Sequence, residues 1–149
     1  IARRQRQMCI RDRYASNKYQ VWTNNQVAGS GSRFMSDNGS STVIGLSRIL
    51  DTSKGEKSPS GASECIFSSD NRAECESFIS WLNTKFTRFF VACNISKLTG
   101  ILTNDYFRFV PAPPSGKFDH IYTDQELYEA FNLPQKYIDI IESVIKERK

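Results

Sequence analysis

The stretch CESFISWLNTKFTRFFVAC, residues 75–93, decides how this chain folds. Its apolar side chains recur at steps of three and four residues, which is the periodicity of one face of an α-helix. These apolar residues are Cys75, Phe78, Ile79, Leu82, Phe86, Phe89, Phe90 and Cys93. Asn71 is suited to cap the helix, and Glu74 is suited to complete a capping box. The pattern predicts one continuous helix of about five turns.

Short stretches on both sides of this helix have the residue types and the alternation of β-strands. They are Lys18–Trp22, Thr42–Leu46, Glu64–Phe67 and Tyr106–Pro111. Three intervening stretches are rich in Gly, Ser, Asn, Asp, Lys or Pro, and we expect them to be loops or linkers. They are Gly29–Ser41, Asp51–Ala62 and Ala112–Asp119.

Two shorter helices are predicted near the C-terminal end. The first is capped by Thr123 with Glu126 as its box partner, and its apolar residues are Leu127, Tyr128 and Phe131. The second begins near Pro134. Its apolar face consists of Tyr137, Ile138, Ile141, Val144 and Ile145. The expected fold is α+β: a small mixed sheet packed on one long amphipathic helix in residues 14–119, with a helical hairpin in residues 120–149.

Residues 1–13 differ in character from the rest of the chain. They contain five arginines and one aspartate, whereas residues 14–149 balance 15 basic against 15 acidic side chains. The hexapeptide Met8–Arg13, MCIRDR, is also the translation of ATGTGTATAAGAGACAGR, which resembles the end of a transposon-based sequencing adapter. We therefore interpret residues 1–13 as a non-native, adapter-derived segment and exclude them from the fold. The remaining chain is neutral, which does not favour strong independent binding to a polyanion.

The sequence offers few groups for catalysis or metal binding. His120 is the single histidine and has no evident acidic or nucleophilic companion, so we expect an ordinary surface side chain. Together with Cys65, Cys75 and Cys93 it could supply four zinc ligands by number. The spacings lack a Cys-x-x-Cys pair, however, so reduced core thiols in a cytoplasmic protein are the favoured interpretation. No catalytic residue and no metal site are predicted.

Four segments of the C-terminal half are informative because of the order in which they occur. They are FISWLNTKFTRFF (78–90), YFRFVP (106–111), IYTDQELYEAFNL (121–133) and YIDIIE (137–142). The series resembles the C-terminal portion of bacterial restriction-modification DNA methylases of the N6-adenine class. In that family F-I-S-Y-L-x-T-K-F-x-R-F precedes V-x-x-F-V-P, W-T-D-E-E-L-Y and E-I-x-F-I-E. The resemblance covers residues 64–149, with weaker similarity at residues 18–22 and 42–46.

The resemblance implies a role within a larger protein. In the family, the S-adenosylmethionine-binding fold and the Asn/Asp-Pro-Pro-aromatic catalytic loop precede this region. Ala112–Ser115 has the two prolines but neither outer residue of that loop. The chain is therefore expected to be the target-recognition fragment. Its expected partners are double-stranded DNA and the N-terminal methyltransferase domain of the same parent chain. The cofactor would belong to that domain, and the protein would be cytoplasmic, with no membrane contact.

Base reading requires side chains with paired donors and acceptors, and phosphate contacts require cations or small donors. The candidate DNA-contacting residues are Asn24, Asn25, Ser30, Ser32, Arg33 and Asn38 in one loop region, Lys54 and Lys57 in another, and Lys85, Arg88, Lys97 and Arg108 on framework elements.

Two other classes of function remain open. A free-standing transcription module would use the last two helices as its reader, but Asp139, Glu142 and Glu147 are unfavourable in a major groove. A non-catalytic protein-interaction domain would also have a neutral charge and no reactive groups.

Overall fold

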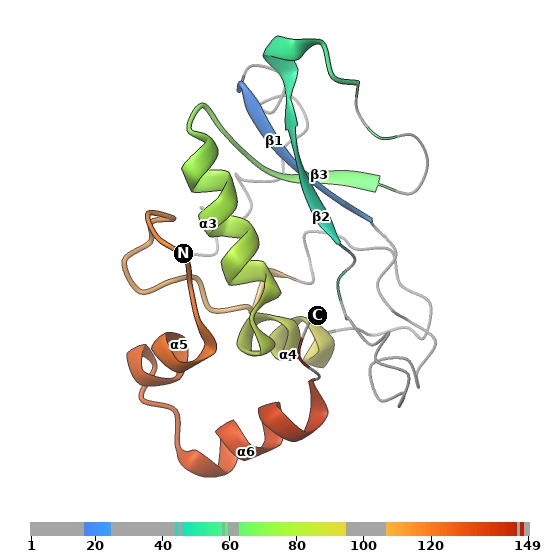
Figure 1. The fold of residues 1–149 in the computed structure, drawn as a ribbon. Helices are drawn as coiled ribbons and strands as arrows, with labels where there is room; N and C mark the ends of the chain where they lie inside the picture. Colours follow the sequence, from blue (N-terminus) through green and yellow to red (C-terminus); the bar gives the residue numbers. More distant parts are fainter. Residues whose placement is uncertain are drawn as a thin grey trace.

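The computed structural model describes residues 17–24, 44, 46–57, 59, 63–94, 107–145 and 147. Within these residues the fold is α+β, as predicted, with a three-stranded sheet and four α-helices. Helix α3 packs against all three strands, and helix α4 packs against α5 and α6. Figure 1 shows the sheet above and the three C-terminal helices below, with α3 running between these two regions.

The sheet has strand β1 (Tyr19–Asn24) at its centre, between β2 (Ser47–Asp51) and β3 (Ser63–Ser69). Both pairings are antiparallel, so the prediction of a mixed sheet was wrong for the described strands. Val21 lies opposite Ile49 on one side and Phe67 on the other, and a register shift follows it in the β1–β3 ladder.

The second strand lies further along the chain than predicted. It pairs from Ser47, opposite Thr23, to Asp51, opposite Tyr19. Leu46 precedes the strand and is 78% exposed, while residues 42, 43 and 45 lie outside the described part. The extent of β2 is thus set by its partner β1, which the local sequence of residues 42–46 does not show.

A short 3-10 helix, η2 (Thr52–Lys54), begins the stretch that was predicted to be loop. The Asp51 carboxylate caps it by accepting a hydrogen bond from the Ser53 amide, at 3.0 Å. Gly55 ends it with φ 69°, a left-handed conformation that glycine adopts without steric cost. The side chain of Lys54 is therefore carried on a tight, capped turn.

The long helix predicted over residues 75–93 is two helices. Helix α3 (Arg72–Asn83) ends and α4 (Lys85–Cys93) begins at Thr84, whose backbone is extended at φ −60° and ψ 149°. The Thr84 hydroxyl accepts a hydrogen bond from the Thr87 amide, at 3.2 Å. Asp124, from a distant segment, accepts one from the Phe86 amide, at 2.8 Å. The apolar periodicity continues across the break, so the pattern alone could not reveal it.

The predicted N-cap of α3 is confirmed, but the second half of its capping box is wrong. Asn71 Oδ1 accepts a hydrogen bond from the Ala73 amide, at 3.0 Å. The Asn71 amide donates to Ser69 Oγ, at 3.0 Å, and that hydroxyl donates to the Glu74 carboxylate, at 2.6 Å. The last residue of β3 therefore joins the strand to the helix, which places α3 against the sheet.

The predicted strand over residues 106–111 is also wrong for its described residues. Phe107–Val110 is a turn, closed by a hydrogen bond from the Val110 amide to the Phe107 carbonyl, at 3.2 Å. Phe107 packs against the core and Val110 is buried, whereas Phe109 is 65% exposed. The first and fourth residues face the core, a spacing that suits a turn rather than a strand. Tyr106 lies outside the described residues.

The predicted linker Ala112–Asp119 takes part in the core. The Phe118 ring lies 5.4, 5.1 and 5.7 Å from the rings of Phe67, Phe78 and Trp81, respectively, centroid to centroid. Phe67 and Phe78 themselves stack at 4.5 Å. This four-ring cluster joins β3, α3 and the segment before the last two helices.

Helices α5 (Asp124–Ala130) and α6 (Gln135–Val144) lie where the sequence predicted helices. Thr123 caps α5 by accepting from the Glu126 amide, at 3.3 Å. Their buried residues are Leu127, Tyr128 and Ile141, and Ile145 just after α6 is buried as well. The half-buried Phe131 ring stacks on Phe86 of α4 at 5.2 Å. Tyr137, predicted to lie on the apolar face of α6, is 47% exposed.

Candidate nucleic-acid interface

The structure describes five of the predicted DNA-contacting side chains. Lys54, Lys57 and Arg108 are exposed, Lys85 is half-buried and Arg88 is buried. Asn24 ends β1, but its side chain lies outside the described part. The remaining candidates also lie outside it: Asn25, Ser30, Ser32, Arg33, Asn38 and Lys97.

Arg88 does not contact a phosphate on the surface, because its side chain is 1% exposed. Its Nε donates to the carbonyl oxygens of Asn83, at 3.0 Å, and Thr84, at 3.3 Å. These carbonyls end α3, and a cation there also interacts favourably with the helix dipole. Burial lowers the pKa of Arg88 and the nearby Asp124 carboxylate opposes that shift. Arg88 thus has a structural role at the break between α3 and α4.

Lys85 is also engaged within the protein. Its ammonium group forms an ion pair with Glu142 of α6. The Tyr128 hydroxyl donates to the same carboxylate, at 2.9 Å. Burial raises the pKa of Glu142, but the hydrogen bonds from Lys85 and Tyr128 outweigh it, so the net shift is downward. A phosphate could bind Lys85 only in competition with this carboxylate.

A polar cavity of about 410 Å³ lies at the junction of α3, α4 and α5. Its lining residues are Ser80, Asn83, Thr84, Lys85, Arg88, Tyr122, Thr123, Asp124 and Glu147. It contains both cations and carboxylates, and its best candidate for an anion site, the N-terminal turn of α4, is already occupied by Asp124. The cavity therefore provides neither an assembled catalytic group nor a vacant anion site.

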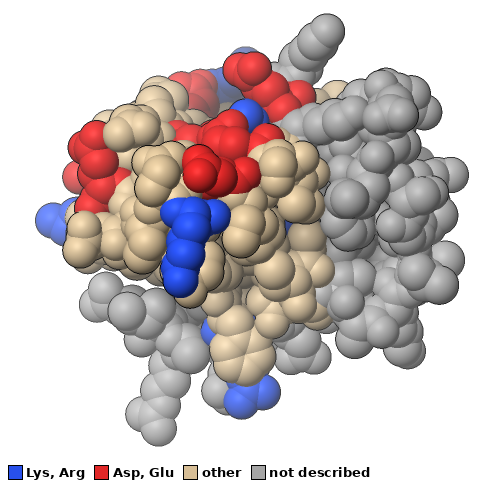
Figure 2. Space-filling view, turned by 90° about the horizontal axis from the view of Figure 1, so that it is seen from below, with Lys and Arg blue, Asp and Glu red and all other residues tan. Residues whose placement is uncertain are grey.

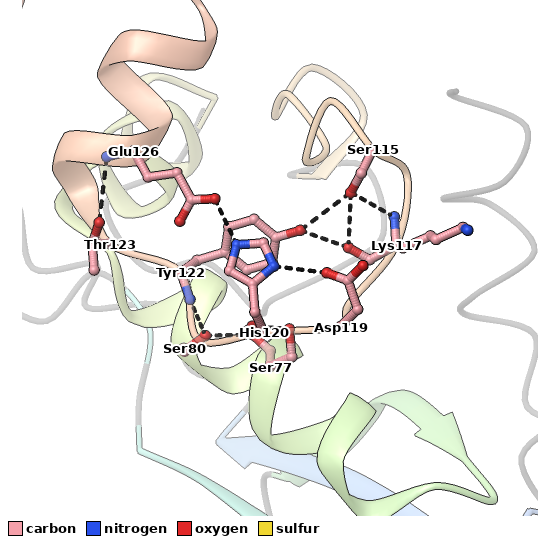
Figure 3. A network of polar contacts seen from close by, with 9 residues as sticks. All are labelled: Ser77, Ser80, Ser115, Lys117, Asp119, His120, Tyr122, Thr123 and Glu126. Carbon is pink, nitrogen blue, oxygen red and sulfur yellow. Dashed lines mark hydrogen bonds and ion pairs between the residues drawn. The ribbon is translucent and has the colours of Figure 1, made fainter.

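His120 lies at the centre of an exposed polar network (Figure 3). Its ring nitrogens contact Asp119 Oδ1, at 2.7 Å, and Glu126 Oε1, at 2.5 Å. The expectation that it has no acidic companion was therefore wrong. Glu126 was predicted to complete the capping box at Thr123, but its carboxylate turns to the histidine instead. The neighbour Asp119 was visible in the sequence, whereas Glu126 is brought close only by the start of α5.

The same segment is tied to α3 by two serines. Ser77 Oγ donates to the carbonyl oxygen of His120, and Ser80 Oγ accepts from the Tyr122 amide, at 2.9 Å. The Tyr122 hydroxyl donates to the Lys117 carbonyl, at 2.6 Å. Figure 3 shows these contacts on both sides of the histidine. The network fixes the path of the chain into α5, and the His120 side chain within it is exposed.

The network predicts a pH-dependent stability. Hydrogen bonds to Asp119 and Glu126 raise the pKa of His120. A raised folded-state pKa stabilises the fold fully below the unfolded value of roughly 6.5, and this stabilisation is lost as the pH rises through the folded value. We expect His120→Gln to lower the melting temperature more at about pH 6 than at about pH 9. Melting of both proteins across this range tests the expectation. The control Arg72→Gln removes an exposed ion pair that contains no histidine, and an equal effect of His120→Gln at both pH values would contradict the prediction.

The three described cysteine thiols differ in their burial. Cys75 is buried, and burial raises its pKa to about 11. Cys65 is half-buried, whereas Cys93 is exposed, so the prediction of a core thiol was wrong for Cys93. Among the described residues no group of three or more His, Cys, Asp or Glu side chains is arranged to hold a metal ion.

Known protein families, curated proteins and solved structures were each compared with this chain, and none of the three comparisons gives a match. No helix of the described part combines the length and apolar character needed to cross a lipid bilayer.

Proposed function

We propose that this chain is the DNA target-recognition portion of a site-specific adenine-N6 DNA methyltransferase of a bacterial restriction-modification system. It would position DNA in the cytoplasm for a catalytic domain that binds S-adenosylmethionine. The observation that carries the proposal is that two of the sequence segments similar to the methylase family, residues 78–90 and 121–133, contact each other at the break between α3 and α4. Arg88 of the first motif binds the carbonyl oxygens at the α3–α4 break, and Asp124 of the third motif binds the Phe86 amide. The first and third segments of the series thus form one structural unit around this break.

The surface charge favours a reader outside the last two helices. Figure 2 shows the lower face of the molecule, where clusters of Asp and Glu side chains lie with separate Lys and Arg side chains between and around them. Exposed carboxylates of α5 and α6 include Glu129, Asp139 and Glu142. Carboxylates on the helix that would enter the groove are unfavourable beside phosphates, so this surface does not support a transcription module that would read DNA with α6. The exposed Lys54 belongs to η2, at the opposite end of the molecule in Figure 1, with Lys57 following in the sequence.

The proposal is tested by grafting residues 14–149 onto the catalytic domain of a DNA methylase of this class. We expect adenine methylation at a defined site, mapped by sequencing, whereas the catalytic domain alone should have no such preference. A neutral recognition module can act in this way because the linked domain contributes much of the affinity. A graft that methylates without site preference, or that makes no DNA contact, would favour the protein-interaction alternative.

The two exposed lysines provide a sharper version of the same test. We expect the graft carrying Lys54→Ser and Lys57→Ser to bind DNA more weakly, with a salt dependence reduced by about one unit of log–log slope per lysine. The matched control carries Lys117→Ser and Lys136→Ser, which remove two exposed lysines from other segments. Equal salt dependence in the two grafts would exclude the η2 end as the phosphate-binding surface.

A further inference from the structure

The turn Phe107–Val110 presents two side chains of different chemistry at its tip. Phe109 is 65% exposed, and the guanidinium carbon of Arg108 lies 5.4 Å from the centre of its ring. The described residues provide no carboxylate partner for Arg108 within ion-pair distance. An exposed aromatic ring beside a cation is the pair of groups with which proteins stack on bases and contact the adjoining phosphates.

The tip stands on a rigid base. The Val110 amide closes the turn on the Phe107 carbonyl, at 3.2 Å. Val110 is buried, Phe107 packs against the core, and the buried Pro113 follows shortly after. A turn whose backbone is anchored before binding loses little conformational freedom when its exposed side chain contacts a partner. The anchored backbone of the turn therefore keeps Phe109 and Arg108 positioned at the surface for a binding partner.

Resting on the proposed function, we propose that this tip is a wedge for double-stranded DNA. Phe109 inserts between adjacent base pairs, and Arg108 contacts a neighbouring phosphate. Apolar side chains inserted at base steps unstack and kink the duplex, and the step is cheapest where the pairing is already weak. Within the turn, Phe107 packs against the core and Val110 is buried, so Phe109 and Arg108 are the side chains that it offers to a partner, one for stacking and one for a phosphate.

Anisotropy titrations of the full chain test the wedge with two labelled duplexes of about 30 base pairs and mixed sequence, one fully paired and one with a central T·T mismatch. We expect the wild-type chain to prefer the mismatched duplex. Phe109→Ala should bind the mismatched duplex about tenfold more weakly, which is the effect of removing one base–aromatic contact. The variant should therefore no longer prefer the mismatched duplex over the paired one. Phe109→Leu, which retains an apolar wedge, should keep the preference. The matched control is Ile121→Ala, because Ile121 is 62% exposed on a different segment.

A fluorescent base analogue provides a readout that affinity alone does not. When 2-aminopurine is placed beside the mismatch, binding of the wild-type chain should unstack this base and increase its fluorescence. The Phe109→Ala variant should not cause this increase. Arg108→Ala should weaken binding to both duplexes alike and reduce the log–log salt slope by about one unit.

The outcomes separate the wedge from the proposed function. If the wild-type chain binds and Phe109→Ala keeps the mismatch preference and the 2-aminopurine signal, the wedge is excluded and target recognition stands. If Phe109→Ala leaves DNA binding unchanged but abolishes binding to the methylase catalytic domain, the tip is a protein contact and the wedge is excluded. If the chain alone does not bind, the same variants and duplexes are compared in the graft, where the same outcomes decide. If neither the chain nor the graft binds DNA, both proposals fail.

Discussion

Replacing Arg88 with alanine is expected to lower the free energy of unfolding by about 3 kcal/mol, because the loss of buried hydrogen bonds adds to the loss of packing. The guanidinium is 1% exposed and donates to the last carbonyls of α3. Without it, the carbonyls of Asn83 and Thr84 lose this buried donor, and the Asp124 carboxylate loses a nearby positive charge. Urea denaturation followed by circular dichroism measures the effect.

Two further variants isolate the cause. Arg72→Ala removes an arginine whose side chain is 54% exposed and paired with Glu76, so it should cost at most about 0.5 kcal/mol. Arg88→Lys keeps the positive charge but lacks the planar group that donates through Nε, and its effect should fall between these values. If Arg88→Ala destabilised no more than Arg72→Ala, the bend between α3 and α4 would not depend on the buried guanidinium.

Phe78→Ala is expected to cost about 4 kcal/mol, in the range for truncating a buried aromatic side chain. Phe78 is 3% exposed, and its ring contacts Phe67, Trp81 and Phe118 at 4.5–5.6 Å between centroids. The truncation removes a ring that links β3, α3 and the segment before α5. The relaxation available to these neighbours is small, because they belong to three different elements.

The matched control is Phe109→Ala, the same chemical change at an exposed position. It should alter the free energy of unfolding by less than about 0.5 kcal/mol. Thermal melts and urea titrations of both variants give the comparison. A similar loss in the two variants would mean that the four-ring cluster contributes no more than a surface ring, which would refute its assignment to the core. An unchanged Phe109→Ala fold also ensures that its DNA-binding result reports on the tip.

Elements governed by local patterns were the ones predicted well from the sequence. The apolar face of residues 75–93, the Asn71 and Thr123 caps and the alternation in β1 and β3 each depend on residues a few positions apart. The break at Thr84 depends instead on Asp124, which is 38 positions from Phe86. Likewise, the extent of β2 follows from its pairing with β1.

The candidate interface was harder to predict for the same reason. Positive charge identified Arg88 as a phosphate contact, but the sequence did not show that carbonyl oxygens at a helix end would surround it. His120 was assigned no companion because Glu126 approaches only when α5 begins. Phe109 was hidden in an apparent strand alternation, which in the structure is a turn with its ring outward. Lys54 and Lys57 are exposed, as a phosphate contact requires.

The hydrogen bond between Asp124 and Phe86 has a consequence for synthesis on the ribosome. Residues 71–93 leave the exit tunnel well before Asp124 does, so the nascent segment passes through a period without the partner that holds the first turn of α4. One of the contacts at the bend between the two helices is therefore completed late, by a residue translated after both of them. A chain stalled before position 124 would lack the carboxylate that accepts the hydrogen bond from the Phe86 amide, and the first turn of α4 would depend on its local cap at Thr84.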